Sequence, residues 1–386
     1  MATSADSVAE ETVVTTGNKV LHWLLVVALV YLLIVAVGVI SSGFRAAVGD
    51  QAAELFAFAN NPVVGLIVGI VATALIQSSS TATAIIVGLV GGGLPVAVAV
   101  PMVMGANIGT ALTSGIVSLS YMRNKEEFNR AFSASTVKDL FNLLAVLIFF
   151  PLEVLFQPLE RLGAAVAQLM VGGADLSIDE FDFVGMITRP LRNLIRDATS
   201  FLPEPFNGIL QIIIGVALIL VAVHFMSILL KQLLVGRAKE ILHTALGRGA
   251  VASIVAGTIV TILVQSSTAT TSLMVPLAGS GAFGLSVIYP FTVGANIGTT
   301  VTGLLAATAV SGPQAVPAMT IALVHLFFNL FGTLIIFGIP FLRDLPVVGS
   351  ERLGAAASER PWVAFAYLGG VFFALPLLLL GLSMLF

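Results

Sequence analysis

The sequence Gln77-Ser78-Ser79-Ser80-Thr81-Ala82-Thr83 interrupts an otherwise apolar run from Val63 to Gly93. All but one of these side chains can form hydrogen bonds, and an unpaired polar group in hydrocarbon costs several kcal/mol. The chain repeats the feature once, as Gln265-Ser266-Ser267-Thr268-Ala269-Thr270-Thr271. Two uncharged polar clusters at membrane depth indicate that the chain uses both clusters together.

The composition around these clusters is that of a membrane protein. Of 386 residues, 58% are hydrophobic and only 10% are charged, whereas soluble globular domains carry about 25% charged residues. We therefore expect an all-α polytopic protein whose main partner is the lipid bilayer, and no nucleic-acid partner. The absence of cysteine excludes disulfide, haem-thiolate and zinc-thiolate chemistry.

Apolar segments of about 20 residues predict transmembrane helices. We expect seven, at residues 22–40, 94–120, 131–150, 208–230, 285–307, 317–339 and 362–386. The segments beside the polar clusters are too short to span, and they lie at residues 63–75 and 82–90, and at 250–264 and 273–279. Each short pair predicts a re-entrant hairpin with its polar cluster at the tip.

The motif Gly-Ala-Asn-Ile-Gly-Thr occurs at residues 105–110 and again at 294–299, and it predicts a break in each of those two spanning helices. Gln77 and Gln265 are 188 residues apart, and the two motif asparagines, Asn107 and Asn296, are 189 apart. Nearly equal offsets predict a duplication. Three crossings in each half make the second copy inverted relative to the first.

The expected domains are a disordered tail (1–18), a first inverted repeat (19–150), an extramembrane amphipathic linker (151–207), a second repeat (208–341), and a loop with a last transmembrane helix (342–386). Lys and Arg residues number 11 in the loops on the N-terminal side and 5 on the other side. This bias predicts a cytoplasmic N-terminus in the cell membrane.

We expect the second helix of each hairpin to bind an anion, and the first helix together with the motif break to bind a cation. The second helix begins at the Ser/Thr run, where free N–H groups and the helix dipole favour an anion. Carbonyls of the first helix and of the motif breaks suit a hard cation such as Na⁺. Neither cluster nor motif holds a charged residue, so an anion there would need a co-bound cation, and mutual dependence of the two ligands is the basis of symport.

Other readings remain open at this stage. Asn142 and Asn329 could bridge helices or belong to the site, and His325 and Lys138 more often make structural hydrogen bonds. Arg189, Arg192 and Arg196 fall on one helical face, which we expect to be solvated or to face lipid. An intramembrane serine hydrolase would need a base near a serine, which neither cluster has, so we do not expect an enzyme; a passive anion channel would not need Na⁺.

The clusters, the paired motifs and the segments Glu127-Phe128-Asn129-Arg130-Ala131-Phe132, Asp139-Leu140-Phe141-Asn142 and His325-Leu326-Phe327-Phe328-Asn329 resemble the type II sodium-dependent phosphate cotransporters over about residues 20–386. The resemblance implies Na⁺-driven uptake of inorganic phosphate by alternating access. It implies phosphate binding by Gln77, Ser78, Ser79, Gln265, Ser266, Ser267 and Thr271. It implies sodium binding by Ser80, Thr81, Thr83, Asn107, Thr110, Thr268, Asn296, Thr299 and Thr300.

The chain departs from that family at three points. Residues 151–207 lack the cysteines that animal members carry in this loop. Asn124 occupies the position at which electrogenic members resemble one another in having an Asp. Lys138 replaces the histidine of the corresponding first-half segment. The Asn124 departure leaves the sodium stoichiometry open. Short loops suggest a bacterial member, the oligomeric state stays open, and a Na⁺-coupled carboxylate carrier is the alternative function.

Overall fold

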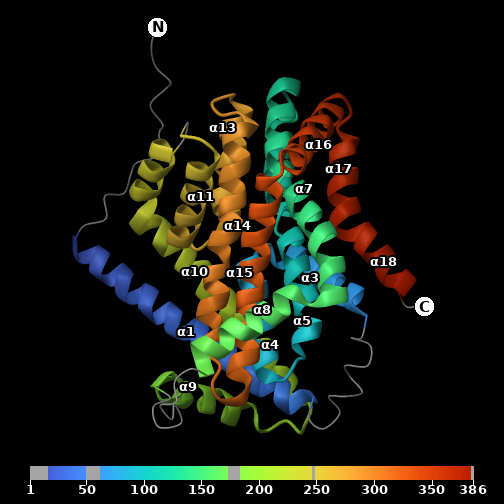
Figure 1. The fold of residues 1–386 in the computed structure, drawn as a ribbon. Helices are drawn as coiled ribbons and strands as arrows, with labels where there is room; N and C mark the ends of the chain where they lie inside the picture. The colour runs from blue at the N-terminus through green and yellow to red at the C-terminus, as the bar shows by residue number, and fades with distance from the viewer. Residues whose placement is uncertain (1–15, 49–60, 173–182, 246–247, 384–386) are drawn as a thin grey trace.

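The computed structural model describes residues 16–48, 61–172, 183–245 and 248–383, and every regular element within those ranges is helical (Figure 1). The all-α prediction is therefore confirmed for the described part of the chain. Most of the predicted disordered tail lies outside the described residues. The helices are α1 (Thr16–Val48), α3 (Pro62–Ile76), α4 (Ser79–Gly92), α5 (Val96–Gly109), α6 (Leu112–Ser118), α7 (Lys125–Phe156), α8 (Pro158–Ala167), α9 (Phe183–Thr199), α10 (Phe206–Ala245), α11 (Ala250–Val264), α12 (Ser267–Ser272), α13 (Met274–Gly279), α14 (Leu285–Ala307), α15 (Ala315–Gly338), α16 (Pro340–Glu359), α17 (Trp362–Gly369) and α18 (Leu375–Ser383).

Among the described residues, six helical segments are long and apolar enough to cross a bilayer, which makes this a multi-pass membrane protein. They are Lys19–Val48, Val96–Tyr121, Lys125–Phe156, Phe206–Leu234, Gly312–Gly338 and Trp362–Leu382. The seventh expected span forms α14 at the predicted bounds, but Asn296 and several threonines make it less apolar than the other six.

The two polar clusters adopt the same backbone conformation. Gln77 ends α3 at φ 59°, ψ 25°, and Gln265 ends α11 at φ 53°, ψ 30°, both left-handed. Ser78 and Ser266 follow in extended conformation, at φ −150° and −152°, and cap the next helix. Because serine is a favoured N-cap, a helix starts at once, and the rest of each cluster lies within α4 or α12 rather than in a loop.

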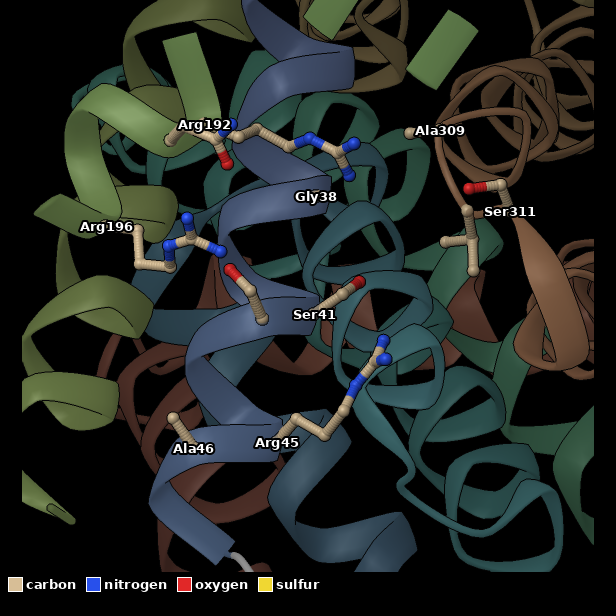
Figure 2. Close-up of a pocket in the computed structure, with 11 residues that line it drawn as sticks. Gly38, Ser41, Arg45, Ala46, Arg192, Arg196, Ala309 and Ser311 are labelled. Carbon is tan, nitrogen blue, oxygen red and sulfur yellow. The ribbon is translucent and has the colours of Figure 1, made fainter. Parts of the chain in front are cut away.

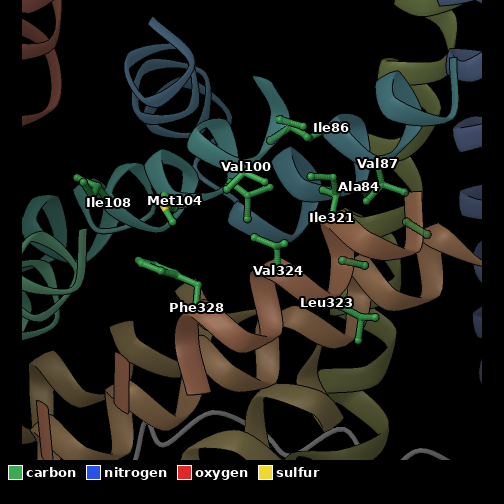
Figure 3. Close-up of a cluster of buried hydrophobic side chains, with 14 of the residues drawn as sticks. Ala84, Ile86, Val87, Val100, Met104, Ile108, Ile321, Leu323, Val324 and Phe328 are labelled. Carbon is green, nitrogen blue, oxygen red and sulfur yellow. The ribbon is translucent and has the colours of Figure 1, made fainter. Parts of the chain in front are cut away.

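Glycines let the short helices pack closely on their neighbours. A Cβ atom added at Gly69, Gly105, Gly257 or Gly294 would lie between 1.9 and 2.1 Å from a backbone oxygen of the facing helix. These contacts join α3 to α5 and α11 to α14. Beside them, apolar side chains from most of the helices, among them α1, α4, α5, α7, α14 and α15, form the main apolar core, and Figure 3 shows part of it from α4, α5 and α15. The polar clusters are therefore held on a tightly packed scaffold.

The prediction of two broken helices is half correct. In the first half α5 ends at Gly109 and α6 begins at Leu112, and the two residues between keep right-handed backbone angles. In the second half α14 runs without interruption through the same motif, which corrects the expectation of a break there. The motif glycines face the backbone of a neighbouring helix in both copies, Gly105 and Gly109 against α3 and Gly294 and Gly298 against α11, so close packing accounts for them in both.

The segment expected as a loop from residue 342 is also helical, which is a second correction. Pro340 occupies the first turn of α16, where a missing N–H costs nothing, and α16 packs along α7. A Cβ added at Gly354 would meet the backbone oxygen of Asn129 at 2.7 Å, so a glycine is needed for this approach. Within the expected linker, α7 continues to Phe156, α8 packs on α15 and α9 packs on α1.

Candidate functional site

The two polar clusters lie against each other, as the sequence predicts. The Thr268 hydroxyl of the second cluster donates a hydrogen bond to the Gln77 carbonyl of the first, at 3.1 Å. Both clusters line one cavity of about 340 Å³. From the clusters and the residues beside them it takes Ile76, Gln77, Ser78, Ser80, Thr81, Gln265, Ser266, Ser267, Thr268, Ala269 and Ser272.

A threonine fixes the side-chain amide of each cluster glutamine. The Thr113 hydroxyl donates to Gln77 Oε1 at 3.3 Å, and the Thr302 hydroxyl donates to Gln265 Oε1 at 2.8 Å. Each threonine comes three residues after its Gly-Ala-Asn-Ile-Gly-Thr motif. Sequence reasoning missed both, although their equal spacing was a signal. With its oxygen occupied, the Gln77 amide can turn its N–H donors toward an anion.

The cap serines keep a donor for a ligand. Ser78 Oγ accepts from the Thr81 amide at 3.2 Å and from the Thr81 hydroxyl at 2.9 Å, and Ser266 Oγ accepts from the Ala269 amide at 3.1 Å. A hydroxyl that accepts at its oxygen still has its own hydrogen to donate. Each cluster therefore offers the cavity an O–H donor fixed at the start of a helix.

Helix α10 forms the third wall of the cavity and brings a positive charge. Its lining residues include His224, Ser227 and Lys231, at the spacing of one helical face. The expectation that an anion here would find no fixed counter-charge is therefore wrong, because it considered only the clusters and motifs. The polar stripe on an otherwise apolar helix was the available signal.

The remaining predicted phosphate residues lie behind the cavity wall. Ser79 and Thr271 are buried, and neither lines the cavity. The Thr271 hydroxyl donates to the Ser267 carbonyl one turn earlier. Of the predicted sodium residues, Ser80, Thr81 and Thr268 line the cavity, as described above.

Three further sodium candidates, Thr110, Thr299 and Thr300, do not line the cavity. The hydroxyls of Thr110, Thr299 and Thr300 donate to carbonyls of their own helical turns at 2.7 to 2.9 Å. These side chains are buried, so their hydrogen bonds satisfy groups that would otherwise be unpaired in an apolar interior.

Thr83, Asn107 and Asn296 belong to a separate buried network. Asn142 donates to the Asn107 carbonyl at 2.7 Å and accepts from Asn296 Nδ2 at 2.7 Å. His325 contacts Asn107 Oδ1 through Nε2 at 3.3 Å and Thr83 through Nδ1 at 3.4 Å. The network joins α4, α5, α7, α14 and α15. Asn142 thus acts as a bridge between helices, one of the two roles left open by the sequence.

The α5–α6 interruption explains why this network forms at Asn107. The Ala111 amide donates to the Ile108 carbonyl, three residues back, instead of to the Asn107 carbonyl four residues back. The Asn107 carbonyl is then available to the Asn142 side chain. A small irregularity in one helix therefore creates the acceptor that a second helix uses.

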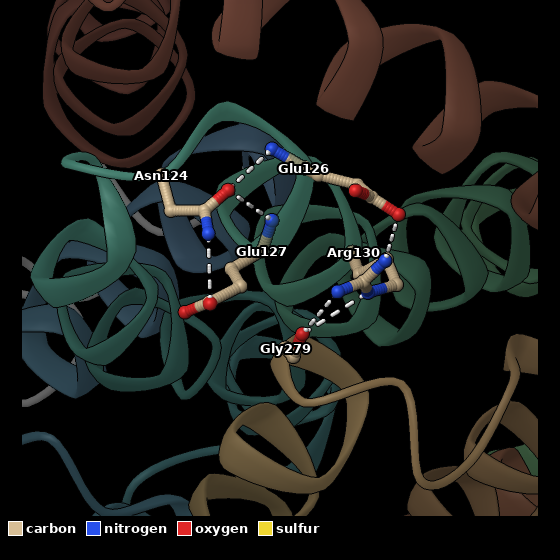
Figure 4. A network of polar contacts seen from close by, with 5 residues as sticks. All are labelled: Asn124, Glu126, Glu127, Arg130 and Gly279. Carbon is tan, nitrogen blue, oxygen red and sulfur yellow. Dashed lines mark hydrogen bonds and ion pairs between the residues drawn. The ribbon is translucent and has the colours of Figure 1, made fainter.

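Asn124 lies at the start of α7 (Figure 4) and does not line the cavity. Its Oδ1 accepts from the amides of Glu126 and Glu127 at 3.1 and 3.4 Å, and its Nδ2 donates to Glu127 at 2.8 Å. Arg130 in the next turn donates to the Gly279 carbonyl at 3.0 and 2.8 Å, which ties α7 to the end of α13. Asn124 therefore works here as a helix cap.

Comparison with known proteins places this architecture in one family. The model of the family described as Na+/Pi-cotransporter matches residues 32–172 and 218–342. The chain is 32% identical to sodium-dependent phosphate transport protein 2A of Rattus norvegicus over 440 residues, covering 95% of this chain and 68% of that protein. It is 29% identical to protein 2B of Homo sapiens, covering 94% and 65%. No solved structure matches the chain. By the family model and by these relatives, the chain belongs to the Na⁺/Pi-cotransporter family.

Proposed function

We propose that the protein couples entry of Na⁺ to uptake of inorganic phosphate. The observation that carries this proposal is the single cavity into which both Gln-Ser-Ser clusters converge. Membership of the family and the names of its curated relatives, sodium-dependent phosphate transport proteins, support the same substrates.

Phosphate binds among the donors that line the cavity. Its oxygens accept from the hydroxyls of Ser78, Ser266 and Ser267 and from the amide of Gln77, while Lys231 supplies one positive charge. Hydrogen bonds to a charged acceptor are stronger than neutral ones, so these donors favour the charged oxygens of phosphate.

Sodium supplies the rest of the positive charge. One lysine does not neutralise a phosphate dianion, and uncompensated charge in a membrane interior is costly. The oxygens of Ser80, Thr81 and Thr268 line the same cavity and suit a hard cation. Each ligand then raises the affinity for the other, which couples the two movements.

The two halves act as inverted repeats, residues 19–150 and 208–341, joined by 151–207, with the clusters at the tips of re-entrant hairpins. The matched left-handed glutamines and the matched threonine bonds to their amides support this proposal. Alternating access follows if the repeats rock about the cavity. In a second conformation Ser79, Thr271 and the motif residues around Asn107 and Asn296 would reach the ligands. The N-terminus is cytoplasmic and the membrane is the cell membrane.

The test is uptake of radiolabelled phosphate into proteoliposomes with and without an inward Na⁺ gradient. Accumulation that needs the gradient is expected; uptake that ignores Na⁺ would remove the symport mechanism and favour a channel. Competition by arsenate and not by succinate is expected, and the reverse would favour a carboxylate carrier. Ser267→Ala should abolish uptake, while the matched change Ser358→Ala, at a half-buried position of α16 outside the cavity, should not.

A further inference from the structure

The buried network around Asn142 is asymmetric, although its residues come in pairs. Asn142 Nδ2 reaches across to the Asn107 carbonyl of α5, whereas Asn329 Nδ2 donates to the His325 carbonyl of its own helix. Paired residues therefore make different contacts in the two halves. The pairs set by the proposed duplication are Asn107 with Asn296, Asn142 with Asn329, and Lys138 with His325.

Three buried polar atoms of these pairs have no hydrogen-bond partner among the described residues. They are Asn107 Nδ2, Asn329 Oδ1 and Lys138 Nζ, and each of the three side chains is at most 2% exposed. Lys138 has the charge of Asp139 beside it, but its ammonium donates no hydrogen bond. A buried polar group without a partner is costly and uncommon, so three in one network need an explanation.

If the two halves exchange conformations, the two amide atoms become partners of each other. In this structure Asn296 Nδ2 donates to Asn142 Oδ1 at 2.7 Å. Replacing each residue by its pair turns this bond into one from Asn107 Nδ2 to Asn329 Oδ1, which are the two atoms without a partner. The movement is short, because Asn329 lies one helical turn from His325, whose ring contacts Asn107 Oδ1 at 3.3 Å.

The same exchange gives the lysine a partner. His325 contacts the Oδ1 atom of Asn107 here, so its pair, Lys138, would contact the Oδ1 atom of Asn296. An ammonium group can only donate and an amide oxygen can only accept, so the new contact is chemically matched. Lys138 lies one turn from Asn142, which already holds Asn296, and the lysine is therefore within reach.

The motif Gly-Ala-Asn-Ile-Gly-Thr already adopts two conformations in this chain. In the first copy the Ala111 amide donates to the Ile108 carbonyl, which leaves the Asn107 carbonyl to Asn142. In the second copy α14 runs through the motif without interruption. Because the six residues are identical, either backbone is accessible to them, and contacts outside the motif decide between the two.

The far ends of α4 and α13 are anchored alike, so they do not account for the asymmetry. Arg45 Nη2 donates to the Gly91 carbonyl in the last turn of α4 at 3.1 Å. Arg130 donates to the Gly279 carbonyl at the end of α13, and Gly279 is the residue that the duplication pairs with Gly91.

Arg45 also lines a second cavity, of about 540 Å³, between α1, α9 and the turn that joins α14 to α15 (Figure 2). Arg192 and Arg196 of α9 line the same cavity. Arg196 is exposed, whereas Arg192 lies over Gly38, where an added Cβ would meet its Cδ at 2.5 Å. This corrects the expectation that the arginine face of α9 only meets solvent or lipid. None of the network residues lines this cavity, so the asymmetry does not arise there.

We propose that the network is a two-state switch whose second state exchanges the roles of the two halves. In that state Asn329 replaces Asn142 as the bridge, and α14 is interrupted instead of α5–α6. Lys138 takes the place of His325. The proposal deepens the proposed function and rests on it, because exchanging inverted repeats turns the cavity from one side of the membrane to the other. His325 contacts Thr83 of the first cluster at 3.4 Å, so the switch reaches the cavity through that cluster.

Hydrogen–deuterium exchange in nanodiscs, measured by mass spectrometry on peptides that cover residues 108–112 and 297–301, tests the switch without transport. Amides of a continuous α-helix are better protected than those of an interrupted one, so the wild type should exchange faster at 108–112. Asn142→Leu removes the bridge of the present state and should reverse that order, with exchange at 297–301 about tenfold faster and at 108–112 slower. Asn329→Leu removes the bridge of the second state and should slow exchange at 297–301 about tenfold.

The matched control is Thr320→Val on α15. The Thr320 hydroxyl is buried and donates to the Val316 carbonyl of its own helix, outside the network, so both peptides should stay unchanged. Faster exchange of both peptides in Asn142→Leu, or of 108–112 alone, would mean that Asn142 is only a brace and would overturn the switch. If Asn142→Leu does not fold, Asn329→Leu decides alone, and unchanged exchange at 297–301 in that variant removes the second state.

Uptake of phosphate separates a failure of the switch from a failure of the proposed function. A transport cycle passes through both states, so Asn329→Leu should lower the maximal uptake rate about tenfold at unchanged expression. If the wild type shows no Na⁺-driven uptake and Asn142→Leu still reverses the order of exchange, the proposed function fails and the switch stands. If the wild type accumulates phosphate and the order does not reverse, the switch fails and the function stands.

Discussion

The Asn142 bridge gives the sharpest test of how the two halves are held together. Asn142→Leu removes a donor to the Asn107 carbonyl and an acceptor for Asn296 Nδ2, both at 2.7 Å. Leucine is similar in size, so the main loss is the two hydrogen bonds. Both stranded partners are buried, at 2% and 4% exposure, where water cannot replace the lost contacts.

The expected cost can be bounded from both sides. Side-chain hydrogen bonds between membrane helices average about 0.6 kcal/mol each, so two such bonds give a lower bound of about 1 kcal/mol. A buried group left unsatisfied costs about 1–3 kcal/mol, so two stranded partners give an upper bound of about 6 kcal/mol. Because both partners of Asn142 are almost fully buried, we expect a loss of about 2–4 kcal/mol.

The matched control is Asn329→Leu, at the position that the proposed duplication pairs with Asn142. Asn329 Nδ2 donates only to the His325 carbonyl, within its own helix, so its loss should cost less than about 1 kcal/mol. The assay is reversible unfolding in mixed micelles with increasing dodecyl sulfate, followed by circular dichroism. If Asn142→Leu destabilises no more than Asn329→Leu, the bridge does not hold the halves together and the reasoning fails.

Three further predictions test the cavity and its scaffold. Gln265→Gly and Gln265→Ala both lose the Thr302 bond and should both impair uptake. The free energy of unfolding of the glycine variant should be about 1 kcal/mol higher than that of the alanine variant, because only glycine adopts the left-handed angles without strain. Equal stability of the two variants would contradict this. Gly257→Ala places a Cβ 1.9 Å from a carbonyl oxygen of α14 and should cost about 3 kcal/mol or more by thermal unfolding, whereas Gly369→Ala meets nothing within 4 Å and should be neutral. Lys231→Gln should raise the KM for phosphate about tenfold with unchanged expression, Lys231→Arg should restore it, and an unchanged KM would remove the lysine from the site.

Local features of the site could be predicted from the sequence because local chemistry sets them. The segment 250–264 forms α11 at the predicted bounds, and α3 ends within one residue of the predicted end. The apolar residues on each side of Gln-Ser-Ser favour helices, and the serine caps the start of the second helix. The local sequence therefore predicts a helix, a short interruption and a second helix. The meeting of the two clusters could be predicted as well, because two lone polar clusters in hydrocarbon each need a polar neighbour.

Features that depend on a neighbouring helix could not be predicted. The same Gly-Ala-Asn-Ile-Gly-Thr motif interrupts α5–α6 and leaves α14 continuous. The motif glycines face a neighbouring helix in both copies, so neither the motif nor those glycine contacts decides which helix is interrupted. In the first copy the Asn107 carbonyl instead accepts from Asn142 of α7, a contact that depends on how α7 packs. The position of Lys231 could not be predicted either, because whether it lines the cavity depends on where α10 packs.

The sequence by itself determined the membrane class, the family resemblance and the two clusters. Hydropathy and capping chemistry act within one segment or about one helical turn, and the repeated spacing is read directly along the chain, so none of the three depends on how the helices pack. Only the tertiary structure decided which predicted ligands line the cavity, that Asn142 bridges the halves, and that three arginines from α1 and α9 gather around a second cavity. Helix packing sets those outcomes, because the rotation of a helix about its axis decides which side chains meet, and no local pattern fixes that rotation.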